Sequence, residues 1–402
     1  MAKNDNLTDF LQDIADTIRA KRGITGSINA QNFATEIAAI EGGGTPTPTP
    51  PTPDIPVIGD GKTYLYIKIV APGRMKVPLY FSQTVANGVT IDWGDGSATQ
   101  TLSGTGNKNT THTYAEIGEY TISLNPSSSC TLGLGRNASN YCVLGSTGND
   151  GKVYCNMLQA VEIGRNITSI GYNAFYGCFS LSSVVIPEGV TSIGNYAFGY
   201  CHSLPSIVIP EGVTSISDSV FRECYSLSSI VIPESVTSIG NNVFRECRSL
   251  SSIVIPESVT SIDFTAFAYC RSLSSIVIPE GITSIGNNTF EECQSLPSIV
   301  IPEGVASIGS YAFSKCYSLS SIVIPESVTS IGNYAFQYCY GMAFYDFSQC
   351  TSVPTLGGSY VFSNIPSDCK IVVPDNLYDT WIATTNWSTH ASKIVKASEF
   401  NS

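Results

Sequence analysis

From residue 158 onward, hydrophobic and polar positions recur with a period of 23 residues. One unit reads Leu227-x-x-Ile230-x-Ile232-Pro233-x-x-Val236-x-x-Ile239 and closes with Val243-Phe244-x-x-Cys247. Side chains alternate along a strand, so Ile230 and Ile232 are expected to point inward, and Pro233 ends the strand. One unit cannot bury these residues alone. The pattern therefore predicts a solenoid in which stacked units share one core.

Cysteine marks every unit of this array. Eight cysteines each follow a phenylalanine by three positions: Cys178, Cys201, Cys224, Cys247, Cys270, Cys293, Cys316 and Cys339. At ~4.8 Å between neighbouring strands, eight units predict a stack of roughly 40 Å. A free thiol at one repeated core position behaves as a small apolar group, and parallel side chains disfavour disulfides between units. Cys130, Cys142 and Cys155 precede the array, and a pair among them could be oxidised.

The first residues show helical periodicity. Leu7, Phe10 and Ile14 share one face of a first short helix, and Phe33 and Ile37 share one face of a second. Both are too short to be stable alone, so they are expected to pack on copies of themselves, on a larger partner, or on the rest of the chain. The segment TPTPTPPTP that follows predicts an extended polyproline II spacer.

Residues 55–125 alternate apolar and polar positions, which predicts strands joined by Gly/Asn turns. The motifs Asp92-Trp93-Gly94-Asp95-Gly96-Ser97, His112-Thr113-Tyr114 and Gly118-Glu119-Tyr120 occur here in order. Together they resemble the polycystic-kidney-disease (PKD) type of immunoglobulin-like sandwich, and this resemblance implies a spacer or accessory binding module. Asp92 and Asp95 are expected to accept hydrogen bonds from the turn backbone, with a cation site as the alternative.

The repeats themselves resemble the BspA-like subgroup of leucine-rich repeats, through the form IVIPExVTSIGxxAFxxC. The first unit departs from it, with Gly164 and Arg165 where later units have Pro and Glu. The first 42 residues look like N-terminal segments of bacteriophage structural proteins. This resemblance implies a virion anchor.

The expected fold is mainly β: a leucine-rich-repeat solenoid of 23-residue repeats, preceded by an immunoglobulin-like (PKD-like) β-sandwich and a short N-terminal helical anchor. The expected domains are a helical anchor or oligomerisation segment (1–42), a Gly/Thr/Pro linker (43–54), the sandwich (55–125), a transition or N-terminal cap (126–157), the solenoid (158–341) and a C-terminal cap (342–402).

The amino-acid composition limits the classes of function that are expected for this chain. Only 13% of the residues are charged, against a typical ~25%, and the formal net charge is −12. A phosphate backbone would repel such a chain, so nucleic-acid binding is not expected. No apolar stretch is long enough to cross a membrane, and no secretory signal is recognisable. With three histidines and no phosphate loop, H-E-x-x-H or G-x-S-x-G motif, we expect no catalytic residue, no cofactor, no metal and no enzymatic activity.

Two sets of outward-facing positions remain. A glutamate follows the proline in seven units (Glu188, Glu211, Glu234, Glu257, Glu280, Glu303 and Glu326), and this ladder is expected to be solvated, with weak calcium binding as the alternative. We call the eight repeated cysteines, Cys178 to Cys339, the ladder cysteines. The two residues before each of them and the one after it differ between otherwise nearly copied units. We call these positions the variable strip. They reflect either drift on an unconstrained surface or recognition, since Tyr and Arg are enriched at binding hot spots. The candidate ligand-binding residues are Tyr200, Tyr225, Arg248, Tyr269, Arg271, Tyr317, Tyr338 and Tyr340.

The order of parts predicts a bacteriophage fibre or spike protein whose adhesive solenoid recognises a host-surface glycan or protein. In this hypothesis residues 1–42 bind virion structural proteins, the chain forms a homo-oligomer (a trimer by analogy with other fibres), and the protein lies on the virion surface. The alternatives are a BspA-like bacterial cell-surface adhesin and a purely structural virion decoration protein.

Overall fold

A computed structural model describes residues 59–135, 141–146 and 155–400. All of them belong to one compact unit, Pro56–Ser402. The predicted helical anchor (1–42) and linker (43–54) lie outside the described residues. Within the described ranges, no helix is both long enough and apolar enough to span a bilayer.

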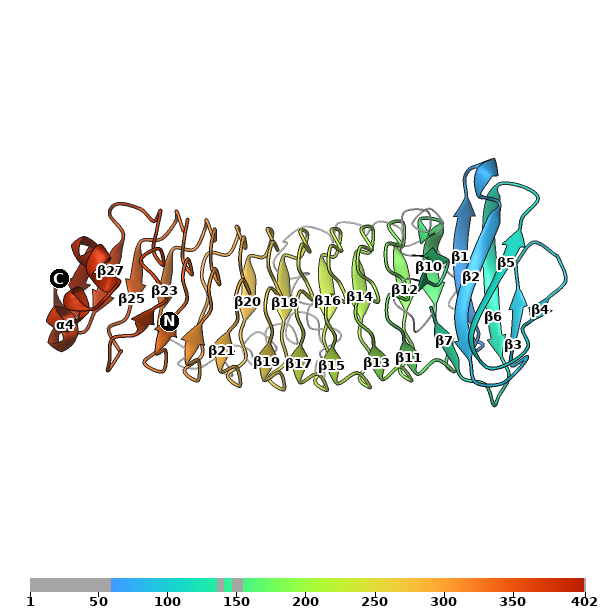
Figure 1. Cartoon of the computed structure of the whole chain (residues 1–402), viewed down its shortest axis with the longest axis horizontal. Helices are drawn as coiled ribbons and strands as arrows, with labels where there is room; N and C mark the ends of the chain where they lie inside the picture. The colour runs from blue at the N-terminus through green and yellow to red at the C-terminus, as the bar shows by residue number, and fades with distance from the viewer. Residues whose placement is uncertain (1–58, 136–140, 147–154, 401–402) are drawn as a thin grey trace, which may run out of the picture. The chain divides into compact units, whose positions relative to one another are not determined.

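In the first part of the chain that the structure describes, two small antiparallel sheets enclose one core (Figure 1). The first holds β1 (Thr63–Ile69), β3 (Val89–Asp92), β4 (Gln100–Thr101) and β6 (Gly118–Pro126). The second holds β2 (Lys76–Gln83), β5 (Gly106–Thr113) and β7 (Leu132–Leu134), and a 3₁₀ turn (Pro72–Arg74) precedes β2. Leu65, Phe81 and Leu124 are fully buried between the sheets. The segment thus contains strands, as its alternating pattern predicted, and apolar residues of these strands face the core.

These sheets continue directly into the repeat array. Strand β1 pairs antiparallel with β10 (Leu158–Glu162), with Leu65 opposite Val161. Strand β7 pairs in parallel with β11 (Ser169–Ile170). The first coil is therefore covered by strands from both small sheets, not by residues 126–157 alone. That segment contributes β7, β8 (Tyr141–Cys142) and β9 (Gly145–Ser146).

Most coils of the array carry two short strands, and at many junctions a strand pairs in parallel with its counterpart in the next coil. The first strands are β12 (Ser183–Val185), β14 (Ser206–Val208), β16 (Ser229–Val231), β18 (Ser252–Val254), β20 (Ser275–Val277) and β23 (Ser321–Val323). The second strands are β11, β13 (Ser192–Ile193), β15 (Ser215–Ile216), β17 (Ser238–Ile239), β19 (Ser261–Ile262), β21 (Ser284–Ile285), β22 (Ser307–Ile308) and β24 (Ser330–Ile331). Ser206 lies opposite Ser229, one 23-residue period later, so the predicted period is the register of the stack.

The interior is a set of side-chain columns along the stack. Ile230 and Ile232 point inward as expected. The phenylalanines stack with ring centroids 5.2 Å apart between Phe175 and Phe198 and 5.8 Å apart between Phe221 and Phe244. All eight ladder cysteines are buried, unpaired thiols. From Cys201 to Cys339, each thiol donates a hydrogen bond to a phenylalanine carbonyl of the preceding coil, at 3.1–3.3 Å.

Hydroxyl groups tie the outside of the stack together. Thr237 Oγ1 donates to the Thr214 carbonyl, Ser258 Oγ to that of Val236, and Ser274 Oγ to that of Ser251. In every case the acceptor belongs to the preceding coil. Bonds between coils therefore explain why Ser or Thr recurs at these three positions of the unit.

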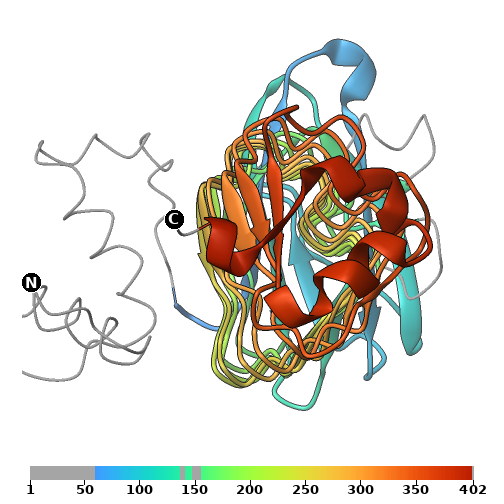
Figure 2. The same cartoon turned by 90° about the vertical axis from the view of Figure 1, so that its left-hand side faces the viewer.

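Parallel pairing continues beyond residue 341, where the solenoid was expected to end. β23 pairs with β25 (Phe344–Asp346), which pairs with β27 (Lys370–Val373), which pairs with β28 (Ile394–Lys396). On the second sheet, β24 pairs with β26 (Thr355–Leu356). Short helices cover the last coil: η2 (Asp375–Leu377), α4 (Tyr378–Ala383), η3 (Trp387–Lys393) and α5 (Ala397–Phe400) (Figure 2). Trp381 and Trp387 are fully buried against Phe347.

Candidate functional site

The variable strip lies on a turn that every coil repeats. The residue before each ladder cysteine adopts a left-handed conformation. The values of φ are 63° at Tyr200, 58° at Glu223, 63° at Glu246, 63° at Tyr269, 56° at Glu292, 60° at Lys315 and 61° at Tyr338. Glycine is the residue that adopts this conformation without steric cost, yet only the first coil has it, at Gly177. In the other seven coils, large side chains therefore occupy a position whose backbone conformation favours glycine.

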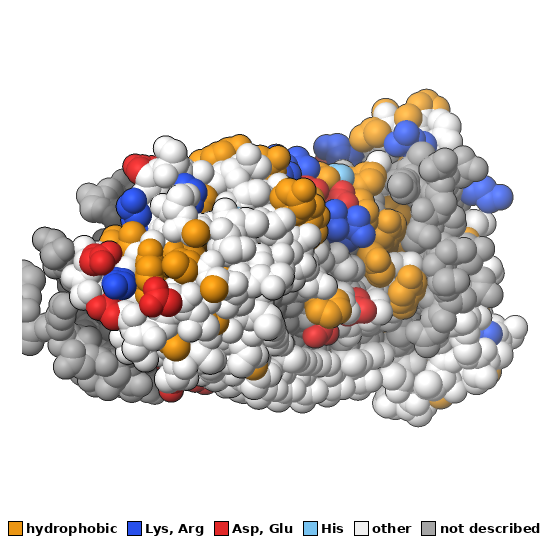
Figure 3. Space-filling model, turned by 60° about the vertical axis from the view of Figure 1, so that its left-hand side comes forward, with side chains coloured by type: hydrophobic (Ala, Val, Ile, Leu, Met, Phe, Trp, Pro, Cys, Tyr) orange, Lys and Arg blue, Asp and Glu red, His pale blue; other side chains and the backbone are white. Residues whose placement is uncertain are grey.

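The eight predicted residues share this surface but extend over seven coils, so they do not form one pocket. Tyr317 and Tyr340 are 37% and 57% exposed, and the side chains of Arg248 and Arg271 are nearly half exposed. Tyr200, Tyr225, Tyr269 and Tyr338 are half-buried. On the face drawn in Figure 3, hydrophobic and charged side chains gather together over the upper part of the array, and its lower part is mostly uncharged.

The N-terminal end of the strip is aromatic. The Phe179, His202 and Tyr225 rings stack at 4.5 Å and 4.3 Å. Tyr176 packs on Tyr200 at 5.0 Å. Tyr172 and Tyr196 lie six and five residues before a ladder cysteine, and they extend this cluster to positions outside the predicted strip. The variation of these positions between units is the feature of the sequence that could have identified them.

The middle of the strip is charged. Glu292 receives hydrogen bonds from Arg271 at 2.9 Å and from Lys315 at 2.7 Å. Burial raises the pKa of Glu292, but these bonds and the two positive charges outweigh burial and hold the pKa below its usual value. Arg248 pairs with Glu246 at 2.6 Å and lies 4.5 Å over the Tyr225 ring.

Arg245 differs from its neighbours. Its guanidinium lies 5.1 Å from the centre of the Tyr269 ring. Among the described residues no carboxylate forms an ion pair with it, and its buried Nε has no hydrogen-bond partner. The Nε of Arg222, one coil earlier in the same column, is likewise buried without a partner.

The C-terminal end of the strip is aromatic again. The Tyr317 and Tyr340 rings stack at 5.5 Å, and Tyr338 contacts Tyr340 edge-on. Beside them, Tyr311, Tyr334 and Tyr360 form a second column with spacings of 4.8 and 5.3 Å. The strip thus has two aromatic ends and a charged middle.

The glutamate ladder lies on another edge of the coil. All seven of its glutamates are exposed, and the Glu211 N–H donates to Glu188 Oε2 at 3.4 Å. The ladder and the strip are separated by about ten positions in each unit. The array is therefore uniformly acidic along the ladder and mixed in charge along the strip.

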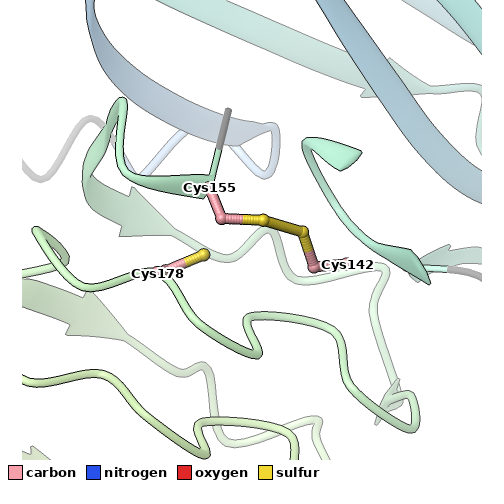
Figure 4. A group of neighbouring side chains, drawn as sticks. All are labelled: Cys142, Cys155 and Cys178. Atoms are coloured by element: carbon pink, nitrogen blue, oxygen red, sulfur yellow. A yellow bond between two sulfur atoms is a disulfide. The ribbon is translucent and has the colours of Figure 1, made fainter. Parts of the chain in front are cut away.

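Three sulfur atoms meet where the small sheets join the array (Figure 4). Cys142 and Cys155 form a disulfide, and the Cys178 thiol lies beside it, with all three sulfur atoms within 4.8 Å of one another. Cys130 is a buried free thiol. The structure thus selects one pair among the three cysteines that the sequence left open. Three neighbouring sulfurs are a donor set that soft metals accept only when the disulfide is reduced.

The aspartates of the Asp-Trp-Gly-Asp motif accept hydrogen bonds from the backbone of their own turn. Asp92 accepts a hydrogen bond from the Gly94 N–H at 2.9 Å, and Asp95 accepts one from the Ser97 N–H at 3.0 Å. Together with a 2.6 Å contact to His112, the bond to Ser97 lowers the pKa of Asp95 to about 2. These contacts agree with the expected backbone-capping role.

Comparison with known proteins identifies the family of the repeats. A family model described as the BspA type leucine rich repeat region, in six copies, matches residues 152–274 and 260–380, more than half of the chain. No curated protein matches the chain. The solved structures similar to it include the following three. A leucine-rich repeat protein from Bacteroides ovatus is 29% identical over 54% of this chain and 66% of its own, with a TM-score of 0.45. The T. pallidum leucine-rich repeat protein is 32% identical over 46% and 78%, with a TM-score of 0.35. A leucine rich cell surface protein from Faecalibacterium prausnitzii is 25% identical over 66% and 86%, with a TM-score of 0.32.

Proposed function

Because the chain belongs to the BspA-type leucine-rich repeat family, we propose that it is a non-catalytic adhesin that presents its variable strip at a bacterial cell surface. The observation that carries this proposal is the contrast within each unit. Core, hydroxyl and thiol positions are nearly copied because they hold the coils together, whereas the strip varies and carries aromatic and charged groups. Recognition is the role that such a surface fits best.

The bacteriophage-fibre hypothesis differs in location and not in recognition. It rests on residues 1–42, which lie outside the described residues. The proposed homo-oligomer also depends on this segment. The PKD-like resemblance supports a spacer role for residues 55–125, which would hold the array away from its attachment point. Fractionating the source culture and detecting the protein by mass spectrometry tests the location. Recovery with the cell envelope supports the adhesin, whereas recovery with virus-sized particles contradicts it and supports the fibre.

Cell binding tests recognition. The purified full chain is compared with a variant in which Tyr225, Arg248, Arg271 and Tyr317 are replaced by Ala. Binding of the fluorescent protein to candidate host cells is expected to fall at least about tenfold, since each of these side chains is of the hot-spot type.

In a matched control, four exposed glutamates of the ladder are replaced by Gln: Glu234, Glu257, Glu280 and Glu303. It is expected to bind as the unchanged protein does. Equal binding by the strip variant and the unchanged chain would sink the recognition role and favour a purely structural protein.

A further inference from the structure

The ligand chemistry can be taken one step further, on the premise that the variable strip is a recognition surface. We infer that the strip binds an extended acidic polysaccharide along the stack, with sugar carboxylates against the arginines of the middle coils and sugar rings on the tyrosines at both ends.

Charge is the first support. Residues 158–341 contain six basic residues, and five of them lie on the strip: Arg222, Arg245, Arg248, Arg271 and Lys315. The strip holds four acidic residues, Glu223, Glu246, Glu291 and Glu292. In a chain of net charge −12, this is the part of the array where positive charge exceeds negative charge. An anionic ligand is attracted here and repelled by the glutamate ladder.

Arg245 is the second support. Arg248, Arg271 and Lys315 are engaged by glutamates of the strip. Arg245 is held in place by the Tyr269 ring, with no carboxylate paired to it among the described residues. An arginine fixed by stacking keeps its planar fork of donors oriented, and such a fork matches a carboxylate. The strip thus offers one anion position that its own glutamates leave free.

The aromatic ends are the third support. A pyranose ring has one face of C–H groups, which packs on the face of an aromatic ring, while its hydroxyl groups remain in water. Tyr340 and Tyr360 are more than half exposed. Tyr340 stacks on Tyr317 and Tyr360 stacks on Tyr334, with ring centroids 5.5 and 5.3 Å apart. Binding positions repeated along one axis suit a polymer, because weak contacts at successive coils combine into useful affinity.

A peptide is the main competing anionic polymer, and the backbone of the strip argues against it. Extended peptides gain affinity by adding a strand to free backbone groups. Here the backbone N–H groups donate to the next coil: Glu246 to the Ala268 carbonyl at 2.9 Å, and Tyr269 to the Glu291 carbonyl at 2.7 Å. Side chains must therefore supply the recognition, as in binding to a sugar chain.

The test measures binding of the purified full chain to polygalacturonate, alginate and hyaluronate. Methyl-esterified polygalacturonate is the uncharged match, and polyglutamate is the anion without sugar rings. We expect binding to at least one uronate polymer that weakens with added salt, and at least about tenfold weaker binding to the ester and to polyglutamate. Equal binding to the ester, equal binding to polyglutamate, or no binding to any uronate polymer overturns the inference.

Substitutions of Arg245 test whether this residue binds a sugar carboxylate. Arg245→Gln is expected to weaken uronate binding about tenfold or more, and Arg245→Lys to restore part of it, because lysine keeps the charge and loses the fork. Arg165→Gln, a change of the exposed basic residue outside the strip, is the matched control and is expected to bind unchanged. Equal melting temperatures show that the variants are folded. Unchanged binding by Arg245→Gln overturns the assignment of Arg245.

The two proposals fail separately. Loss of cell binding in the strip variant, together with no uronate binding, removes the acidic polysaccharide and leaves the adhesin. Uronate binding without any cell binding removes the adhesin and leaves the ligand chemistry.

Discussion

Two residues in each coil have left-handed backbone, one of them directly before the ladder cysteine. At Tyr200, Glu246 and Lys315 the side chain is large, although the left-handed region costs a non-glycine residue about 1 kcal/mol or more. These side chains contact neighbours on the strip: Tyr200 contacts Tyr176, and Glu246 contacts Arg248. Contacts of this kind offset part of the backbone cost.

This cost can be measured at Glu246. Because both replacements remove the carboxylate, the comparison of Glu246→Gly with Glu246→Ala isolates the backbone. The glycine variant is expected to be more stable by about 1 kcal/mol in urea unfolding. At Arg245, which does not have left-handed backbone, the order is expected to reverse. The same order at both positions would contradict the argument.

The ladder thiols make stability depend on pH. Burial raises the pKa of Cys224 and of Cys339 from 9.0 to about 12. A raised pKa in the folded state means that the full stability is present below the unfolded-state pKa and is lost as pH rises towards the folded-state value. Each such thiol therefore lowers the free energy of unfolding by up to about 1.4 kcal/mol for each pH unit between about 9 and 12.

The measurement is the unfolding free energy at pH 8, 10 and 11. We expect the protein to be less stable at each alkaline step, and Cys224→Ala to lose less stability between pH 8 and 11 than the unchanged chain. Parallel pH profiles for the two proteins would show that this thiol does not titrate as argued.

Single elements here have little stability of their own. A two-residue strand such as β17 persists because Ser238 and Ile239 pair with β15 on one side and β19 on the other. The coil, and not the strand, is the structural element, and its phenylalanine joins it to both neighbours.

Phe244 tests this at the centre of the stack. Phe244→Ala is expected to lower the unfolding free energy by about 3–5 kcal/mol, because a fully buried ring between two others leaves a cavity. Val254→Ala, at a side chain 57% exposed, is the control and is expected to change stability by less than about 0.5 kcal/mol. Similar losses for both would contradict the stacked-column description.

At the scale of the whole molecule, the array is a sum of nearest-neighbour contacts between two covered ends. Strands β1 and β7 cover the first coil, and the helices at the other end bury Trp381 of α4 and Trp387 of η3. A repeat can be removed from such a stack if the register is kept.

Deletion of residues 227–249 removes one full period and is expected to leave a soluble, folded protein with one coil fewer. Deletion of residues 238–249 removes about half a period, places inward residues outside, and is expected to give an aggregated or unfolded protein. Circular dichroism and size-exclusion chromatography distinguish the two results. A folded product from the half-period deletion would contradict the stated register.

The sequence alone determined the coil. Partners in the stack lie one period apart, so the spacing of Ile230, Phe244 and Cys247 was enough to predict the parallel register, the buried columns and the variable strip. Contacts between segments without a common period were decided only by the tertiary structure. The pairing of Leu65 with Val161 and the Cys142–Cys155 disulfide join segments that no repeat relates. The residue types of the strip could be read from the sequence, but it could not show that Arg245 has no carboxylate partner among the described residues. Whether a charge has a partner depends on how neighbouring coils orient their side chains, and that is settled by packing in three dimensions.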